Sequence, residues 1–171
     1  TVAINLSAVS LADLALVDKI HHRVCANQIE PSSIILEITE TAVMANVALS
    51  LNTLARLRLI GFGLSIDDYG TGFSSMQQLA RIPFTELKID RSFVDGSSES
   101  LQLENMVSIS LDTARKLGLT CVAEGVETVE DWQLLKRLGC HVAQGYLIAK
   151  PMPGNQLIDW IKSNSKRLRE L

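Results

Sequence analysis

The stretch Leu64-Ser-Ile-Asp-Asp68 decides the fold, because a short apolar run ends there in two adjacent carboxylates. Leu51, Leu54 and Leu57 precede it at helical spacing, and a Gly/Ser-rich segment, residues 70–75, follows it. A short apolar run between amphipathic stretches is typical of a strand in a parallel sheet. The stretch is therefore predicted to be a strand that ends in acidic side chains.

The same unit recurs along the whole chain. Strands are predicted at residues 2–6, 34–38, 64–66, 86–89, 120–123 and 141–144. Apolar side chains at helical spacing predict helices at residues 14–24, 51–57, 103–117, 129–138 and 156–168, with a short one stopped by Pro83. Gly118 and Gly139 stand where helix C-caps are expected. Strands that alternate with helices indicate a parallel sheet.

Two parallel folds compete for this pattern. A doubly wound sheet binds its ligand mostly at one switch point, whereas a (β/α)8 barrel collects polar side chains at the carboxyl ends of many strands. Polar side chains lie in or at the end of every predicted strand, namely Asn5, Glu37, Asp67, Lys88, Glu124 and Gln144. No Gly-x-Gly-x-x-Gly fingerprint follows any strand. A TIM-like (β/α)8 barrel is therefore predicted, with six units in residues 1–171 and about two more upstream, so that the chain is expected to be one domain truncated at its N-terminus.

The composition excludes several classes of protein. The 171 residues are 47% hydrophobic, which excludes a disordered chain. The net charge of −3 gives no basic surface for a DNA or RNA duplex, although metal ions could attract a small phosphate ligand. No apolar run reaches the ~18 residues that a membrane span needs, and no signal peptide is expected. Cys25, Cys121 and Cys140 fit neither a disulfide framework nor a zinc site, and they are predicted to be small buried residues of a protein in the reducing cytosol.

Asp67 and Asp68 are the sharpest local feature. Two adjacent carboxylates repel each other, and burying both is costly unless a cation lies between them. One carboxylate of the pair could bridge two divalent ions while its neighbour binds only one; alternatively, the pair is a helix N-cap and a solvated aspartate. Glu37, Asn5 and Glu124 would add hard oxygen ligands, which suit Mg²⁺ or Mn²⁺ rather than zinc. Taken singly, Glu37 could equally form a salt bridge, and Asn5 could be an amide that bonds a loop.

Lys88 lies between Leu87 and Ile89, so the alternation of a strand places it on the opposite face from both. That face points either into the barrel or toward the helices. An inward lysine beside metal-bound carboxylates could orient or activate a water, or it could serve only as their counter-ion. Gln144 could hold a metal-bound water or the substrate, or it could be a core amide. The segment Gly70-Thr-Gly-Phe-Ser-Ser75 lacks the ending of a P-loop and is interpreted as an active-site loop.

Several motifs, read in chain order, resemble those of one known family. They are Asn5-Leu-Ser7, Leu36-Glu-Ile-Thr-Glu40, Ile66-Asp-Asp-Tyr-Gly-Thr-Gly-Phe-Ser-Ser75, Leu87-Lys-Ile-Asp-Arg-Ser-Phe93, Ala123-Glu-Gly-Val-Glu127 and Gln144-Gly-Tyr-Leu147. Taken together, they resemble the EAL-domain phosphodiesterases, which hydrolyse the bacterial second messenger cyclic di-GMP to linear pGpG. The resemblance implies the same barrel fold and a reaction in which two metal ions, Mg²⁺ or Mn²⁺, assist the attack of water.

The resemblance also implies a set of metal ligands. Asn5, Glu37 and Asp67 would bind one ion. Asp67 would bridge to the second ion, which Asp68 and Glu124 would also hold, either directly or through water.

Further roles follow from the same resemblance. Lys88 would position the attacking water, and Glu124 and Gln144 would take part in the same catalytic network. Glu40 would anchor the loop of residues 70–75, which is coupled to a dimer interface in relatives. The resemblance further implies a homodimer, attached sensory or GGDEF domains, and a cytoplasmic domain whose parent protein could carry a membrane anchor.

Some positions depart from the family pattern. Tyr69, Phe73 and Met76 replace the usual Phe, Tyr and Leu, and Ile148 stands where an aromatic is usual. The Glu-Ala-Leu tripeptide, whose glutamate is a metal ligand, should precede Asn5, so this span alone is expected to be inactive. The alternative function is a non-catalytic receptor for cyclic di-GMP, or a protein-interaction domain of the same fold. The intact motifs favour the enzyme, because degenerate relatives lose several ligands.

Overall fold

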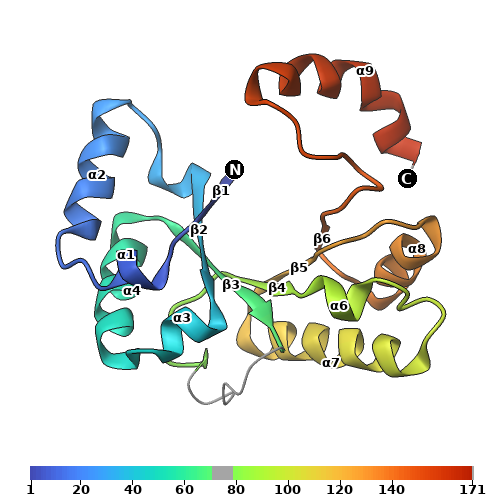
Figure 1. The fold of residues 1–171 in the computed structure, drawn as a ribbon, viewed down its shortest axis with the longest axis horizontal. Coiled ribbons are helices and arrows are strands. Elements are labelled where there is room, and N and C mark those ends of the chain that lie inside the picture. The colour runs from blue at the N-terminus through green and yellow to red at the C-terminus, as the bar shows by residue number, and fades with distance from the viewer. Residues whose placement is uncertain (71–78, 171) are drawn as a thin grey trace.

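Six parallel strands form one sheet whose order follows the sequence, β1-β2-β3-β4-β5-β6 (Figure 1). The computed structural model describes residues 1–70 and 79–170. The strands are β1 (Val2–Asn5), β2 (Ile34–Thr39), β3 (Gly63–Tyr69), β4 (Glu86–Ile89), β5 (Thr120–Ala123) and β6 (Val142–Ala143). The predicted strands are confirmed, and each pairs in parallel with its neighbour in the chain. Such a sheet is a run of consecutive β/α units, as predicted for the barrel.

Helices connect these strands. Within the described residues they are α1 (Ala8–Leu11), α2 (Leu16–Ala26), α3 (Glu40–Met44), α4 (Val47–Ile60), α6 (Arg91–Val94), α7 (Leu101–Leu117), α8 (Val129–Leu138) and α9 (Leu157–Glu170), with 3₁₀ turns η1 (Pro31–Ser33) and η2 (Gly154–Gln156). The longer predicted helices are confirmed, and Gly118 and Gly139 are the C-caps of α7 and α8. The predicted start of α2 was wrong: Leu14 precedes the helix and is 75% exposed.

Three short helices that the apolar pattern does not predict begin directly after strands. Ser7, Thr39 and Asp90 cap them, because each side chain accepts a hydrogen bond from a backbone amide two or three residues further on. A side-chain cap satisfies amides that have no partner inside the helix. The chain therefore turns sharply at the carboxyl ends of β1, β2 and β4, where the polar side chains lie.

The hydrophobic core lies between the sheet and the helices. The strands supply alternate apolar side chains to it, and the helices supply facing ones. Its buried members include Leu36, Ile38, Leu64, Ile66, Leu87 and Ile89 from the strands and Leu54, Leu57, Val107 and Leu111 from the helices. Because strand side chains alternate, the residues between these apolar ones point to the opposite face of the sheet. That inner face carries the polar side chains of the predicted site.

Asp131, at the start of α8, is a buried carboxylate that holds the segment between α6 and α7. Its oxygens accept hydrogen bonds from Thr128 Oγ1 at 2.6 Å, from the Ser98 amide at 2.8 Å and from Ser97 Oγ at 3.3 Å. Burial alone would raise the pKa of Asp131, but these hydrogen bonds outweigh it and lower the pKa. The carboxylate therefore stays ionised while it joins α8 to residues that follow β4.

The last helix, α9, lies apart from the helices that cover the sheet (Figure 1). Arg167 joins it to the segment after β6, because its guanidinium donates hydrogen bonds to the carbonyl oxygens of Leu147 at 3.1 Å and Ile148 at 2.6 Å. No helix within residues 1–70 and 79–170 is both long enough and apolar enough to cross a membrane.

Two groups of predictions need correction or fall outside the described residues. Cys121 is buried as predicted, but Cys25 is exposed and Cys140 is half-buried, so the prediction was wrong for these two. Cys140 packs against the edge of the core and is partly uncovered there, whereas Cys25 is exposed on α2. The predicted loop of residues 70–75 and the departures Phe73 and Met76 lie, after Gly70, outside the described residues.

Candidate active site

Lys88 is the centre of the site. β4 points its side chain to the inner face of the sheet, which decides between the two orientations that the sequence allowed. Its ammonium nitrogen lies 2.8 Å from Glu37 Oε1 on β2, 3.1 Å from Asp67 Oδ1 on β3 and 2.6 Å from Glu124 Oε1 directly after β5. The Lys88 side chain is only 4% exposed. One ammonium group therefore joins carboxylates from three different strands.

The ammonium group and the carboxylates of this cluster change one another's pKa values. Burial alone would lower the pKa of Lys88, but its hydrogen bonds with Glu124 and Glu37 raise the pKa well above its usual value. Burial raises the pKa of Glu124, and the neighbouring ammonium opposes that rise. These contacts therefore favour Lys88 as a protonated hydrogen-bond donor in this arrangement.

A β-bulge in β3 brings Asp67 and Asp68 to the same place. Ile66 pairs with Leu87 and Tyr69 pairs with Ile89, so β3 has one more residue than β4 between these two pairs. Asp68 adopts a φ of 57°, in the left-handed region, and its amide donates to Asp67 Oδ1 at 3.1 Å. Regular alternation would point adjacent side chains to opposite faces, and the bulge removes that restriction.

The acidic side chains converge closely enough to hold a cation. Ligand oxygens of Asp67, Asp68 and Glu124 all lie within 4.8 Å of one another. Burial, together with the charges of Asp67 and Asp90, raises the pKa of Asp68, and the charge of Lys88 opposes that rise. Hard oxygen donors of this kind suit Mg²⁺, Mn²⁺ or Ca²⁺. The donor set therefore fits a divalent metal.

The remaining predicted ligands lie at the same end of the sheet. Asn5 ends β1 and is in register with Glu37 on β2, so their Cα atoms are neighbours across the two strands. Gln144 directly follows β6, and its side chain is exposed. The backbone amide of Gln144 donates a hydrogen bond to Ala123 O at 2.8 Å, and its backbone carbonyl oxygen accepts one from Val126 N at 3.0 Å. Main-chain hydrogen bonds thus hold Gln144 beside the segment that carries Glu124.

The segment after Glu124 is held on one side by Arg91. A Cβ atom on Gly125 would lie 2.2 Å from Arg91 Cγ, and Gly125 has a φ of 70°, so both space and conformation require glycine there. The Arg91 guanidinium then reaches Glu127 Oε1 at 2.9 Å. On the other side, a Cβ on Gly145 would lie 2.2 Å from Val126 O. The ends of β4, β5 and β6 are therefore packed against one another.

Glu40, the predicted loop anchor, lies at the start of α3. Its Oε2 atom accepts a hydrogen bond from the Gly70 amide at 3.4 Å. Gly70 is the last described residue before the predicted loop. This contact links the end of β3, and so the bulge, to α3.

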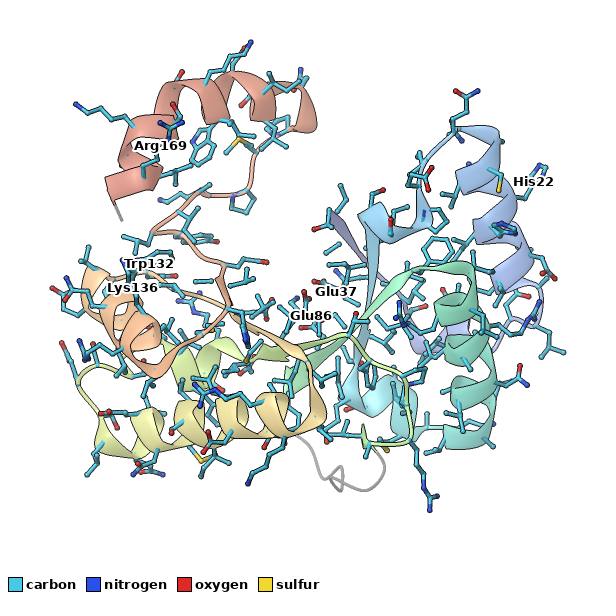
Figure 2. All side chains as sticks on the ribbon, turned by 180° about the vertical axis from the view of Figure 1, so that it is seen from behind. His22, Glu37, Glu86, Trp132, Lys136 and Arg169 are labelled. Atoms are coloured by element: carbon cyan, nitrogen blue, oxygen red, sulfur yellow. The ribbon has the colours of Figure 1, made fainter. Side chains whose placement is uncertain are left out.

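Sequence reasoning missed Glu86 as a member of the site. It lies two residues before Lys88 on β4 and pairs in register with Ser65 of β3. Burial and the charge of Glu37 raise the pKa of Glu86. In Figure 2 the labelled side chains of Glu37 and Glu86 lie near each other at the middle of the sheet. The period of two along the strand was the available signal, because Glu86 and Lys88 must share a face.

Comparison with known proteins places this geometry in a family. A sequence model described as the EAL domain matches residues 1–151. Over 157 residues, the chain is 43% identical to the bifunctional diguanylate cyclase/cyclic di-GMP phosphodiesterase MucR of Pseudomonas aeruginosa, with 92% of this chain and 23% of MucR covered. It is 39% identical to the cyclic di-GMP phosphodiesterase RocR of the same organism, with 92% of this chain and 40% of RocR covered. The chain thus spans less than half the length of either relative.

Solved structures agree with this assignment. The structure of the MucR phosphodiesterase in complex with c-di-GMP has a TM-score of 0.86 at 44% identity and covers 91% of this chain and 63% of that chain. Klebsiella pneumoniae BlrP1, solved with cyclic di-GMP and either calcium or manganese, has a TM-score of 0.81 at 33% identity and covers 87% of this chain and 38% of that chain. The six strands are thus part of a TIM-like barrel. By sequence and by structure, the chain belongs to the EAL domain family.

Proposed function

We propose that this chain forms the catalytic part of a phosphodiesterase that opens cyclic di-GMP to linear pGpG. The observation that supports this function best is the convergence of Glu37, Asp67, Asp68 and Glu124 around Lys88 at one end of the sheet. A cyclic dinucleotide carries two phosphodiesters, so a pocket of bare carboxylates would repel it. Divalent cations reverse that repulsion, and the chain belongs to a family whose named relatives act on this substrate.

We assign the oxygen ligands of the site to two metal positions. Asn5, Glu37 and Asp67 would hold the first ion, while Asp67, Asp68 and Glu124 would hold the second. Mg²⁺ and Mn²⁺ are the proposed ions, since both accept octahedral oxygen ligands. When bound, the two ions would make a water more acidic and neutralise charge that develops on the phosphate and the departing oxygen.

Lys88 would position the attacking water. Its ammonium group is directed at Glu37, Asp67 and Glu124, and one of its three N–H groups would turn to a water once a metal ion holds one of these carboxylates. In the reaction, the water oxygen bonds to phosphorus, the bond from phosphorus to the ribose oxygen breaks, and that oxygen leaves with a proton. Gln144, held beside the Glu124 segment, would donate to a water or to a phosphate oxygen from the mouth of the site.

A non-catalytic receptor for cyclic di-GMP is the second candidate, and one observation favours it. Lys88 contacts three carboxylates by itself, so its ammonium group already supplies one positive charge inside the cluster. In a receptor the ammonium would remain in that place, whereas in an enzyme it shares the carboxylates with metal ions. The two functions therefore differ in whether added metal changes the surroundings of Lys88.

Turnover of cyclic di-GMP by the full-length protein, with Mn²⁺ or Mg²⁺, tests the proposal. Lys88→Met should lower kcat roughly 100-fold or more with little change in substrate affinity, because a water-positioning donor acts mainly in the transition state. Asp68→Asn should weaken occupancy of the second metal as well as lower the rate. Lys19→Met is the matched control, because Lys19 pairs with Asp13 on the exposed surface. Tight binding of cyclic di-GMP without turnover would establish the receptor instead.

Other parts of the proposal concern the setting of the site. Residues 1–171 are treated as one domain of a protein that can carry sensory or GGDEF domains and that forms a homodimer. Glu40 would transmit changes at the dimer interface to the site through Gly70. A cytoplasmic location agrees with the three free cysteine thiols, since reducing compartments keep thiols unpaired.

A further inference from the structure

Cys121 and Cys140 lie together at the opposite end of β5 and β6 from the carboxylate site. Cys121 belongs to β5 and is fully buried, while Cys140 comes just before β6 and is half-buried. Val122 and Val142 pair across the two strands, which brings the preceding cysteines close together. Cys140 Sγ lies 3.2 Å from Val142 O and 3.7 Å from Cys121 O. Both thiols are free.

The two thiols differ in acidity. The interaction between the two side chains lowers the pKa of Cys140 and, together with burial, raises the pKa of Cys121. Hydrogen bonds with the backbone at Val142 and Ala123 also lower the pKa of Cys140. Its contacts with carbonyl oxygens favour the protonated form and limit the fall. Cys140 is therefore the member of the pair that ionises first, and thiolates are the reactive form of cysteine.

Cys140 is also the member that small molecules can reach. A cavity of about 180 Å³ is lined by Trp132, Leu135, Lys136, Cys140, His141, Val142 and Ala143. Trp132 and Lys136, which both belong to α8 and line this cavity, are labelled next to each other in Figure 2. Lys136 brings a positive charge to the cavity, which favours an anionic sulfur. Cys121 does not line the cavity, so a reagent meets Cys140 first.

We propose that Cys140 and Cys121 form a thiol modification site at which a small hydroperoxide converts the pair to a disulfide. The Cys140 thiolate sulfur bonds to one peroxide oxygen, the O–O bond breaks, and the departing oxygen takes a proton to leave as water or alcohol. Cys140 is then a sulfenic acid. The Cys121 sulfur bonds to the Cys140 sulfur and loses its proton, and the hydroxyl group leaves as water. Two thiols are oxidised by two electrons, the peroxide is reduced by two, and a dithiol reductant restores both thiols.

This site is independent of the proposed phosphodiesterase activity. The disulfide would join the starting end of β5 to Cys140, two residues before β6, and the other ends of these strands lead to Glu124 and Gln144. No carboxylate of the active site belongs to the pair or lines its cavity. Chemical modification can therefore be measured without reference to cyclic di-GMP.

The full chain offers an internal comparison in Cys25, which is exposed on α2. The protein is treated with increasing hydrogen peroxide at neutral pH, the remaining thiols are alkylated, and the digest is analysed by mass spectrometry without reduction. The expected product is a linked Cys121–Cys140 peptide pair with a mass loss of about 2 Da, the two hydrogens of the thiols. Cys121 and Cys140 should disappear in equal amounts and reappear after dithiothreitol, while Cys25 stays out of the linkage.

Variants separate the site from general oxidation. Cys25→Ser should leave the linkage unchanged, whereas Cys140→Ser should abolish it and leave Cys121 unreacted, because Cys121 has no access of its own. Trp132 fluorescence, measured in a Trp160→Phe background, should change during oxidation and reverse with reductant, since Trp132 shares the cavity with Cys140. Accumulation of sulfinic acid at Cys140 without loss of Cys121, or faster oxidation at exposed Cys25 with no linked pair, would overturn the proposal.

Discussion

Replacing Lys88 by methionine removes one charge and keeps most of the volume of a buried side chain. Its nitrogen contacts three carboxylate oxygens at 2.6 to 3.1 Å, and each of those side chains is less than one-fifth exposed. Removing one partner of a buried ion pair typically costs about 3 to 5 kcal/mol. We expect the lower part of that range, roughly 3 kcal/mol of unfolding free energy at pH 7, because the orphaned carboxylates can take up protons or reach water.

Two conditions should restore the lost stability. In the variant the crowded carboxylates lose the ammonium group that opposes their mutual repulsion, so we expect the folded protein to bind more protons than the unfolded chain. Its stability relative to the wild-type protein therefore recovers as the pH falls from 7 toward 5. Mn²⁺ should act in the same direction, since a cation that is present at about 100 times its dissociation constant contributes roughly 2.7 kcal/mol.

Urea unfolding of the wild-type protein and the variant, in a chelator and in Mn²⁺, measures both effects. Lys19→Met is the control, because Lys19 pairs with Asp13 at 2.6 Å, a separation like those of Lys88, but its side chain is 67% exposed. Solvent screens that surface pair, so its loss should hardly change the midpoint. The reasoning is refuted if Lys88→Met and Lys19→Met behave alike, or if Mn²⁺ stabilises the Lys88 variant no more than the wild-type protein.

Three further outcomes are expected. Turnover should depend on Mg²⁺ or Mn²⁺, fall strongly when Ca²⁺ replaces them and stop on chelation, because a larger ion distorts a two-metal geometry; turnover that persists after thorough chelation would contradict the metal ligands proposed here. Gly125→Ala should lower both turnover and stability, since its Cβ meets Arg91, whereas Gly118→Ala, at a similar φ in open space, should cost only about 1 kcal/mol in thermal unfolding. Asp131→Asn should cost about 1 to 3 kcal/mol at neutral pH. The folded-state pKa of Asp131 is lowered, so the difference in stability between the wild-type protein and the variant should vanish as the pH falls below the usual pKa of 3.8. An equal loss of stability in the exposed control Asp112→Asn would argue against the buried hydrogen bonds.

The alternation of strands and helices was predictable because the core imposes it. Each strand gives alternate apolar residues to one face, and each long helix carries an apolar stripe, so both periods appear in the sequence. The short helices after β1, β2 and β4 were not predictable in this way. They are about one turn long and depend on caps at Ser7, Thr39 and Asp90 rather than on an apolar pattern.

The site was predictable in its membership more than in its geometry. Polar residues at strand ends identified Glu37, Asp67 and Lys88 as neighbours, because parallel strands end at a common edge. The sequence left open which face Lys88 occupies, since alternation relates side chains to one another and not to the barrel axis. The period of two placed Glu86 on the same face as Lys88, but burial of Glu86 could not be predicted, because a charged residue at the start of a strand is equally compatible with exposure.

The thiol pair shows a different limit. Cys121 and Cys140 are far apart in the sequence, and only the pairing of β5 with β6 brings them together. Composition predicted burial for all three cysteines, yet the exposure of each depends on whether neighbouring elements cover it. Cys25 lies on the outer side of α2 and remains exposed.

The bulge in β3 suggests how a protein with this fold can change its function during evolution. One additional residue opposite Lys88 allows a single strand to present both Asp67 and Asp68 at the mouth of the sheet. An in-frame deletion of one codon there would return β3 to regular alternation and turn one carboxylate away, while Leu64 and Ile66 kept their places in the core. A lineage could thus lose a metal position in one genetic step without losing the fold. Relatives that evolved from a catalytic ancestor and now only bind the ligand would be expected to have a β3 strand that is one residue shorter.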